Sequence, residues 1–252
     1  MGEKLKTFAL GTFAATALLA LTIPACAGPV DTPVNGASAA ESATGTATPT
    51  VTPTPVPKAF TSADLAAIVR QVRDPADRRL TVLPEADVTA ALEQSKDMMS
   101  SLEVAPAACL ELATSSTVPA MDGAATAMGV STDTSTGAVM ALSLLSGLDE
   151  ATLGGVTGRP AQLEQCANMT VTISGVSVPV SITTVNGVGG LPNTVAYRTE
   201  TEMPDGQVQS IITAQAIHEG VVLTAVASGG GSEAETVVRT GALLDSAAAL
   251  VK

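Results

Sequence analysis

The segment NMTVTISGVSVPVSI, residues 168–182, indicates the fold class. Apolar and polar residues alternate through Met169 and Val171, which is typical of a strand with one buried face. A second alternating run occupies residues 176–182. Because Pro179 has no N–H to donate to a neighbouring strand, we expect this second strand to lie at a sheet edge. The segment therefore predicts two antiparallel strands of a larger sheet.

Further strands are expected on both sides of this segment. Residues 124–131 and 137–145 read as a pair around the turn residues 132–136. Residues 194–202 and 208–217 flank Met203-Pro204-Asp205-Gly206, which is a strong turn sequence. His218-Glu219-Gly220 then turns the chain into a last run at 221–227.

Helices are expected before and after the strands. The first begins in FTSADL, residues 60–65, with a cap residue, an acid three positions later and a hydrophobic staple, and it ends at Asp74-Pro75. A second begins at Pro84, and short helical pieces are expected at 106–113 and ending near 162–166. The apolar stripe of the helix that begins at Pro84 comprises Val88, Ala91, Leu92, Met99 and Leu102.

A final helix begins at Ser232-Glu233-Ala234-Glu235, which forms a capping box. The residues expected on its buried face are Ala234, Val237, Val238, Gly241, Leu244, Ala248 and Val251. Helices followed by hairpin-linked strands and a last helix predict an α+β fold: an antiparallel β-sheet with helices packed on one side.

The first 25 residues have the pattern of a signal peptide. Lys4 and Lys6 precede an uncharged stretch of 17 residues, 7–23, that is short for a membrane span. The sequence Ile23-Pro24-Ala25-Cys26 then resembles a bacterial lipobox. This resemblance implies cleavage between Ala25 and Cys26, a diacylglycerol anchor on the Cys26 thiol and acylation of the new amino terminus, for example by palmitate. The chain is thereby expected on the extracytoplasmic face of the cell membrane.

Residues 26–57 are predicted to form a disordered tether after the lipidated cysteine. The segment is rich in Thr, Pro and Ala and has no apolar period, so it offers no face to bury. Its Thr and Pro content also permits O-glycosylation. The remaining residues, 58–252, are expected to fold as a single domain.

This domain contains two cysteines, Cys109 and Cys166. In an exported domain, two cysteines most simply form one disulfide. A redox pair is the alternative, although the two residues lack the C-x-x-C spacing. We expect the structural disulfide.

Several stretches of the domain are similar to a known family: FTSADLAAI (60–68), PAAC (106–109), Cys166 before the alternating strands, EGVVLTAVASG (219–229) and LLDSAAALVK (243–252). Together with the anchor and tether they resemble an actinobacterial-type lipoprotein that carries a PknH-like extracellular sensor domain. The resemblance implies a cleft over a sheet that binds a ligand or partner without catalysis. Leu163 stands where the family often has Trp.

Composition excludes several classes of site. The net charge of −12 argues against nucleic-acid binding, which needs clustered cations. Beyond the signal peptide the only aromatic residues are Phe60 and Tyr197, so aromatic cages and stacking platforms are excluded. His218 is the only histidine, so a cluster of histidine ligands is excluded as well.

Five features of the sequence resemble functional sites but have simpler interpretations. Residues 228–232 and 186–190 are glycine-rich but lack the Walker and dinucleotide spacings, so both are expected to be loops. Asp133-Thr134-Ser135-Thr136-Gly137 is expected to be a hairpin turn, and His218 a solvated turn residue. The acids Asp74, Asp77 and Glu85 are expected to be solvated rather than to bind a cation.

The sequence therefore predicts a membrane-anchored lipoprotein whose domain is a non-enzymatic, sensor-like module that binds an unknown ligand or envelope protein. No catalytic residue, cofactor or metal site is predicted, and no ligand-binding residue is assigned. A lipid or glycolipid carrier with an apolar cavity is the alternative, since the domain is aliphatic and poor in aromatics. A cell-envelope hydrolase has the least support.

Overall fold

The computed structural model describes residues 60–114, 124–173 and 175–252. The signal peptide, the lipobox cysteine Cys26 and the tether all lie outside these residues. Within them, no helix has the length and apolar character that a membrane span requires.

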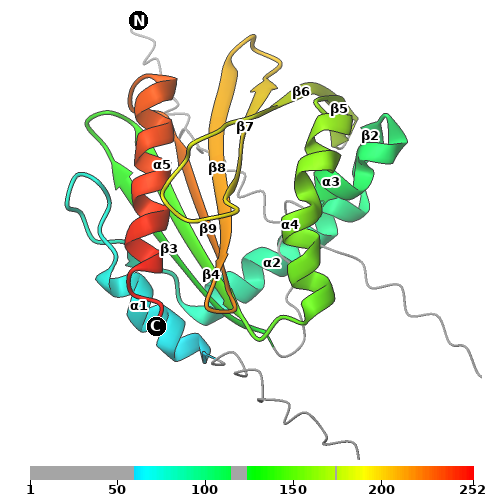
Figure 1. Ribbon diagram of the computed structural model, residues 1–252. Helices are drawn as coiled ribbons and strands as arrows, with labels where there is room; N and C mark the ends of the chain where they lie inside the picture. Colours follow the sequence, from blue (N-terminus) through cyan, green and yellow to red (C-terminus); the bar gives the residue numbers. More distant parts are fainter. Residues whose placement is uncertain (1–59, 115–123, 174) are drawn as a thin grey trace, which may run out of the picture.

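The described chain forms one nine-stranded antiparallel sheet (Figure 1). The strand order is β1-β3-β4-β9-β8-β7-β6-β5-β2. The strands are β1 (Thr81–Val82), β2 (Glu103–Ala105), β3 (Ala125–Asp133), β4 (Ala138–Ser146), β5 (Asn168–Ile173), β6 (Val176–Thr184), β7 (Val195–Glu202), β8 (Val208–His218) and β9 (Val221–Ser228). The predicted α+β class, antiparallel sheet and disulfide are confirmed.

The helices are α1 (Ser62–Gln71), α2 (Glu85–Ser100), η1 (Ala107–Cys109), α3 (Leu110–Thr114), α4 (Glu150–Gln165) and α5 (Glu233–Ala248). Capping boxes at Thr61 and Ser232 begin α1 and α5, as predicted. Asp149 caps α4, and its Oδ1 accepts a hydrogen bond from the Thr152 N–H at 2.8 Å. This helix has 16 residues and is longer than the short piece predicted. Its full length is not evident in the sequence because Gly154, Gly155, Gly158 and Pro160 have low helix propensity.

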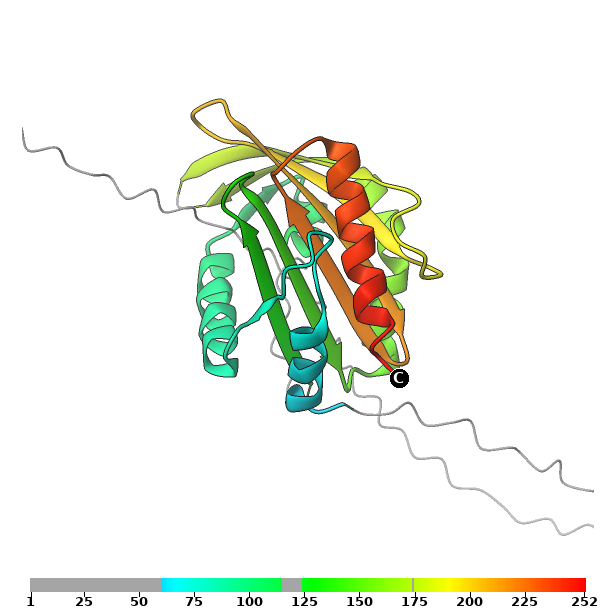
Figure 2. The ribbon, with the colours of Figure 1, turned by 90° about the vertical axis from the view of Figure 1, so that its left-hand side faces the viewer.

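The helices cover both faces of the sheet, and the prediction of helices on one side is wrong in this respect. Helices α1 and α5 lie together on one face, as Figure 2 shows, and α4 lies on the other. The core under α1 and α5 includes Leu142, Ala214 and Ala225, which are in register on β4, β8 and β9. Residues one position along these strands point to the α4 face because successive strand residues alternate.

Two predicted apolar helix faces need correction. On α5, Val238 is 69% exposed, and Thr236 and Thr240 are buried instead. In the stripe predicted for α2, Val88 is buried and Leu102 packs against the core cluster around the disulfide, but Ala91 is exposed. The predicted stripe of α1 is confirmed: Leu65, Ile68, Val69 and Val72 are all buried.

The edge position predicted for the Pro179 strand is also wrong. Strand β6 lies between β5 and β7. Pro179 pairs with Thr170 of β5, whereas pairing with β7 begins at Val180. The proline is tolerated because it lies just beyond the end of the β6–β7 ladder. The actual edges are the short strands β1 and β2, which have too few residues to show a period in the sequence.

Candidate functional site

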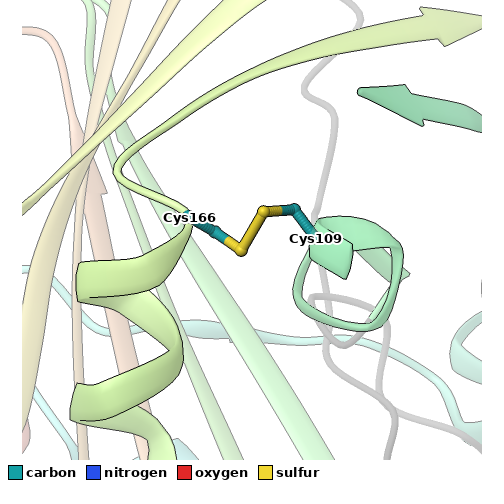
Figure 3. The surroundings of a disulfide bond; sticks show 2 residues. All are labelled: Cys109 and Cys166. Atoms are coloured by element: carbon teal, nitrogen blue, oxygen red, sulfur yellow. A yellow bond between two sulfur atoms is a disulfide. The ribbon is translucent and has the colours of Figure 1, made fainter. Parts of the chain in front are cut away.

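The disulfide between Cys109 and Cys166 joins η1 to the end of α4 (Figure 3). The two Cα atoms are 5.6 Å apart and the S–S bond is 2.03 Å long. Both cysteines are buried in a cluster with Leu163 of α4 and with Val180 and Ile182 of β6. The bond thereby fixes the end of α4 next to the sheet.

The buried stripe of α4 is made up of Val156, Arg159, Leu163 and the C-cap residue Cys166. Their spacing of three and four residues places them on one side of the helix, which packs against β6, β7 and β8. Three of them are apolar or disulfide-bonded. The fourth, Arg159, is only 3% exposed, so this stripe holds a guanidinium against the sheet.

Arg159 is incompletely paired. Its side chain hydrogen-bonds to Tyr197 of β7, but its Nε and Nη1 have no hydrogen-bond partner. No ion pair to Arg159 exists within the described residues. Burial lowers the pKa of the guanidinium, and the Tyr197 hydroxyl opposes that shift only in part. A buried cation with free donors is uncommon, because its desolvation is normally offset by a carboxylate.

Tyr197 is the second buried polar group at this place. It is 7% exposed and lies directly opposite Thr213 of β8 in the sheet register. Burial raises the pKa of Tyr197, whereas the positive charge of Arg159 and a hydrogen bond with Thr213 lower it. The net shift is upward, so the phenol stays protonated near neutral pH and its O–H remains a donor.

Two further polar side chains lie on the same face of the sheet, in the register row next to that of Tyr197 and Thr213. Gln215 of β8 and Thr224 of β9 are in register, and Gln215 Nε2 donates to Thr224 Oγ1 at 2.9 Å. Gln215 Oε1 is buried without a partner. We call five buried residues the polar layer: Arg159 of α4 and, on the face of the sheet against which α4 packs, Tyr197, Thr213, Gln215 and Thr224. The layer presents hydroxyl, amide and guanidinium groups, which bind ligands through hydrogen bonds and charge.

The structure places the sequence-predicted features away from this layer. Asp133 is the last residue of β3, where it forms an ion pair with Arg78 at 2.7 Å, and Arg78 also contacts Asp74. His218 ends β8, and its position three residues from Gln215 places it on the opposite face of that strand. Asp133 and His218 therefore lie outside the polar layer.

The two glycine-rich segments are loops, as predicted. The backbone N–H of Gly190 donates to both carboxylate oxygens of Asp245 on α5, at 2.8 and 3.0 Å. In the other loop, Arg239 donates to the carbonyl oxygens of Gly229 and Gly230. Hydrogen bonds within the protein therefore already occupy the Gly190 N–H and the carbonyl oxygens of Gly229 and Gly230.

The three acids considered as cation ligands in the sequence, Asp74, Asp77 and Glu85, do not form a cluster. Asp74 is buried and pairs with Arg78, Asp77 pairs with Arg73, and Glu85 lies in the first turn of α2. In the part of the chain that the structure describes, no three His, Cys, Asp or Glu side chains come together to hold a metal ion.

Two shallow hollows are found on the described surface. One is a groove of about 480 Å³ between α1, β3 and the start of α2, lined by Ala66, Arg70 and Val88. The other, of about 490 Å³, lies over β5, β6 and β7 on the side of Glu200 and Glu202. Neither hollow includes a residue of the polar layer.

Sequence reasoning missed the polar layer. The available signal was Arg159 itself, a charged residue at the i+3 position of the stripe Val156, Leu163 and Cys166. Because glycines and Pro160 hid the length of α4, that stripe could not be read and Arg159 appeared to be an ordinary surface residue.

Comparisons with known proteins give a structural likeness and no sequence match. No protein-family model matches the sequence, and no curated protein matches it. The structure is similar to the extracellular domain of PknH from Mycobacterium tuberculosis, at 15% identity over 76% of this chain and 98% of that one, with a TM-score of 0.46. It is also similar to a putative uncharacterized protein (Rv0999 ortholog) from Mycobacterium smegmatis, at 14% identity over 77% of this chain and 98% of that one, with a TM-score of 0.40.

Proposed function

We propose that the protein is an extracytoplasmic lipoprotein, anchored to the membrane through Cys26, whose domain binds a ligand or partner without catalysis. The observation that carries the binding function is the polar layer. Its five side chains are buried, yet Arg159 and Gln215 keep unpaired donor and acceptor atoms. Buried polar groups are normally paired, so unpaired ones are a feature of binding sites.

Export is supported by the disulfide and by the start of the sequence. Disulfides are typical of oxidising compartments outside the cytoplasm, and Cys109–Cys166 is formed in the fold. The charged start, the apolar stretch and the lipobox-like Ile23-Pro24-Ala25-Cys26 occur in the order that a lipoprotein signal requires.

The absence of catalysis is proposed from the chemistry of the polar layer. Tyr197, Thr213 and Thr224 bring hydroxyl groups, but activation of a hydroxyl nucleophile needs an adjacent base. The only histidine of the chain, His218, lies on the opposite face of β8. The layer is therefore suited to binding rather than to hydrolysis.

The anchor is tested by fractionating cells that produce the protein. We expect the parent in the membrane fraction, with a mass increased by acyl groups, and Cys26→Ser in the soluble fraction without them. Ala27→Ser is the matched control, because it changes the adjacent residue and retains the thiol. An unmodified parent mass would disprove the anchor.

The binding function is tested by native mass spectrometry of the protein isolated under mild conditions. We expect a non-covalent adduct of one small molecule or one partner. A long-chain lipid adduct would instead favour a carrier. A hydrolase activity that copurifies with the protein and is lost in His218→Ala would overturn the non-enzymatic proposal.

A further inference from the structure

Resting on the proposed function, we infer that the polar layer binds an anionic group of the ligand, a carboxylate or a phosphate, with Arg159 as its charged contact. The argument uses the burial of Arg159, the charges around it, the donors beside it and the direction from which the layer can be reached.

The positive charge of Arg159 is buried away from water. The residue is 97% buried, and its Nε and Nη1 have no hydrogen-bond partner. Removing a guanidinium from water is unfavourable unless an anion and further hydrogen bonds replace the lost hydration. A bound carboxylate or phosphate provides both the charge and the acceptors, and arginine recognises these two groups particularly well.

Other arginines of the domain have carboxylate partners although they are less buried than Arg159. Arg78 contacts Asp74 and Asp133, and Arg198 contacts Glu200 and Glu233. The chain carries twice as many acidic as basic residues, 24 against 12, so carboxylates are plentiful. Arg159 nevertheless has no ion pair within the described residues.

Nearby acids face away from the polar layer. Glu200 and Glu202 of β7 alternate with Tyr197 and lie on the opposite face of that strand. On α4, Glu150 and Glu164 are exposed, outside the buried stripe. On the sheet under α4, the neighbours of the layer along its own strands are apolar or hydroxyl-bearing: Val195, Thr199, Ile211, Ile217, Val222 and Val226. Among the described residues, an entering anion would therefore meet a positive charge without a competing carboxylate.

A neutral donor lies next to the charge. Tyr197 hydrogen-bonds to Arg159, and its phenol stays protonated, so the O–H can be donated. Thr213 lies directly opposite Tyr197, and its hydroxyl hydrogen-bonds to that of Tyr197, so the pair keeps one O–H to donate. An anionic group thus finds the cationic donors of Arg159 on α4 and one neutral hydroxyl donor of the Tyr197–Thr213 pair.

The sheet register indicates the side from which the layer is reached. Helix α4 packs against β6, β7 and β8, and the polar layer continues past its cover to Thr224 of β9. Thr224 is in register with Ser143 of β4, which is half-buried. Exposure therefore increases from Arg159 towards β4, and we place the entrance there.

The test is a titration of the purified protein with inorganic phosphate and, separately, with acetate, at constant ionic strength and pH 7. The readouts are the Tm and the NMR signal of the Arg159 Nε–H in ¹⁵N-labelled protein. We expect one of the anions to give a saturable shift of that signal and a saturable rise in Tm. Saturation by phosphate alone assigns a phosphate group, and saturation by acetate alone assigns a carboxylate.

Arg159→Met should abolish the rise in Tm, because it keeps an unbranched side chain and removes the charge and the N–H donors. Arg70→Met, on the exposed side of α1, is the matched control and should respond like the parent. Tyr197→Phe gives a second variant that keeps the ring in the core and Arg159 in place. We expect it to bind the anion about two- to tenfold more weakly, which is the usual effect of one lost hydrogen bond.

The inference is overturned if neither anion shifts the Arg159 signal saturably, or if a folded Arg159→Met binds as the parent does. An unchanged affinity in Tyr197→Phe also contradicts it. None of these results disproves the proposed function, since a neutral ligand or a protein partner would still give an adduct in native mass spectrometry. Conversely, a His218-dependent hydrolase activity would disprove the proposed function and leave the anion titration to be judged separately.

Discussion

Ser131 donates a hydrogen bond to Oδ2 of Asp74 at 2.9 Å, and so joins β3 to the turn that follows α1. The side chain of Asp74 is completely buried. It also accepts from Nε of Arg78 at 2.7 Å and from the backbone N–H groups of Ala76 and Arg78. Asp74 is thus a buried charge whose hydrogen bonds are complete, which is the opposite of Arg159.

This network predicts a loss of stability in acid. Burial raises the pKa of Asp74, but the hydrogen bonds from Arg78, Ser131 and Ala76 together lower it by more, so the net shift is downward. Hydrogen bonds from Ser135 and Arg78 hold the pKa of Asp133 far below its usual range. A carboxylate with a depressed folded-state pKa contributes stability that is complete above its unfolded pKa of about 4 and is lost as the pH falls towards the folded value.

We therefore expect the urea midpoint to fall steeply below about pH 4 in the parent protein and less steeply in Asp74→Asn. Asp97→Asn, on the exposed side of α2, is the control and should follow the parent. If Asp74→Asn loses stability in acid as steeply as the parent, the network does not act as described.

Much of this fold could be predicted from the sequence, and the failures have physical reasons. The strands at 168–173 and 208–218 show period-two alternation or strong turns, and capping boxes mark Thr61 and Ser232. Strands β1 and β2 have two and three residues, too few for a period. The second helical layer was not predicted because the glycines and Pro160 of α4 obscure its stripe, and Arg159 was missed with it.

Gly129→Ala should destabilise the protein. A Cβ at this position would lie 2.4 Å from Cγ1 of Val69 and 3.1 Å from Cβ of Leu80, so α1 would have to move away from β3. Overpacking of this kind costs about 1–3 kcal/mol. Gly154→Ala in α4 is the control, since a Cβ there meets nothing within 4 Å, and it should stabilise by about 0.5–1 kcal/mol. Urea unfolding measures both, and equal midpoints would contradict the prediction.

Removal of the disulfide should also destabilise the protein. Cys109 and Cys166 are 57 residues apart, and closing a loop of that length restricts the unfolded chain by about 4 kcal/mol. We expect the double variant Cys109→Ala/Cys166→Ala to unfold at a lower urea concentration. A reductant should lower the midpoint of the parent and leave that of the double variant unchanged. Two titratable thiols in the unreduced folded protein would show that the bond is not formed.

Asp245→Ala should release the loop at 186–190 from α5. Its carboxylate accepts both hydrogen bonds from the Gly190 N–H, which then loses its partner. A loss of about 1 kcal/mol corresponds to exchange of that amide about fivefold faster. Asp205→Ala, in the turn between β7 and β8, is the control and should leave Gly190 exchange unchanged. An unaltered rate in Asp245→Ala would mean that other contacts hold the loop.

The position of β9 sets the order in which the domain can form. This strand lies between β4 and β8, although both precede it along the chain. Helix α5 follows β9, and Val251 just after α5 is only 1% exposed. The sheet stays split into two halves until residues 221–228 are available, and long-range pairing of this kind is slow. A chain still being synthesised therefore cannot close its core early. It completes its sheet only when its last strand and helix arrive.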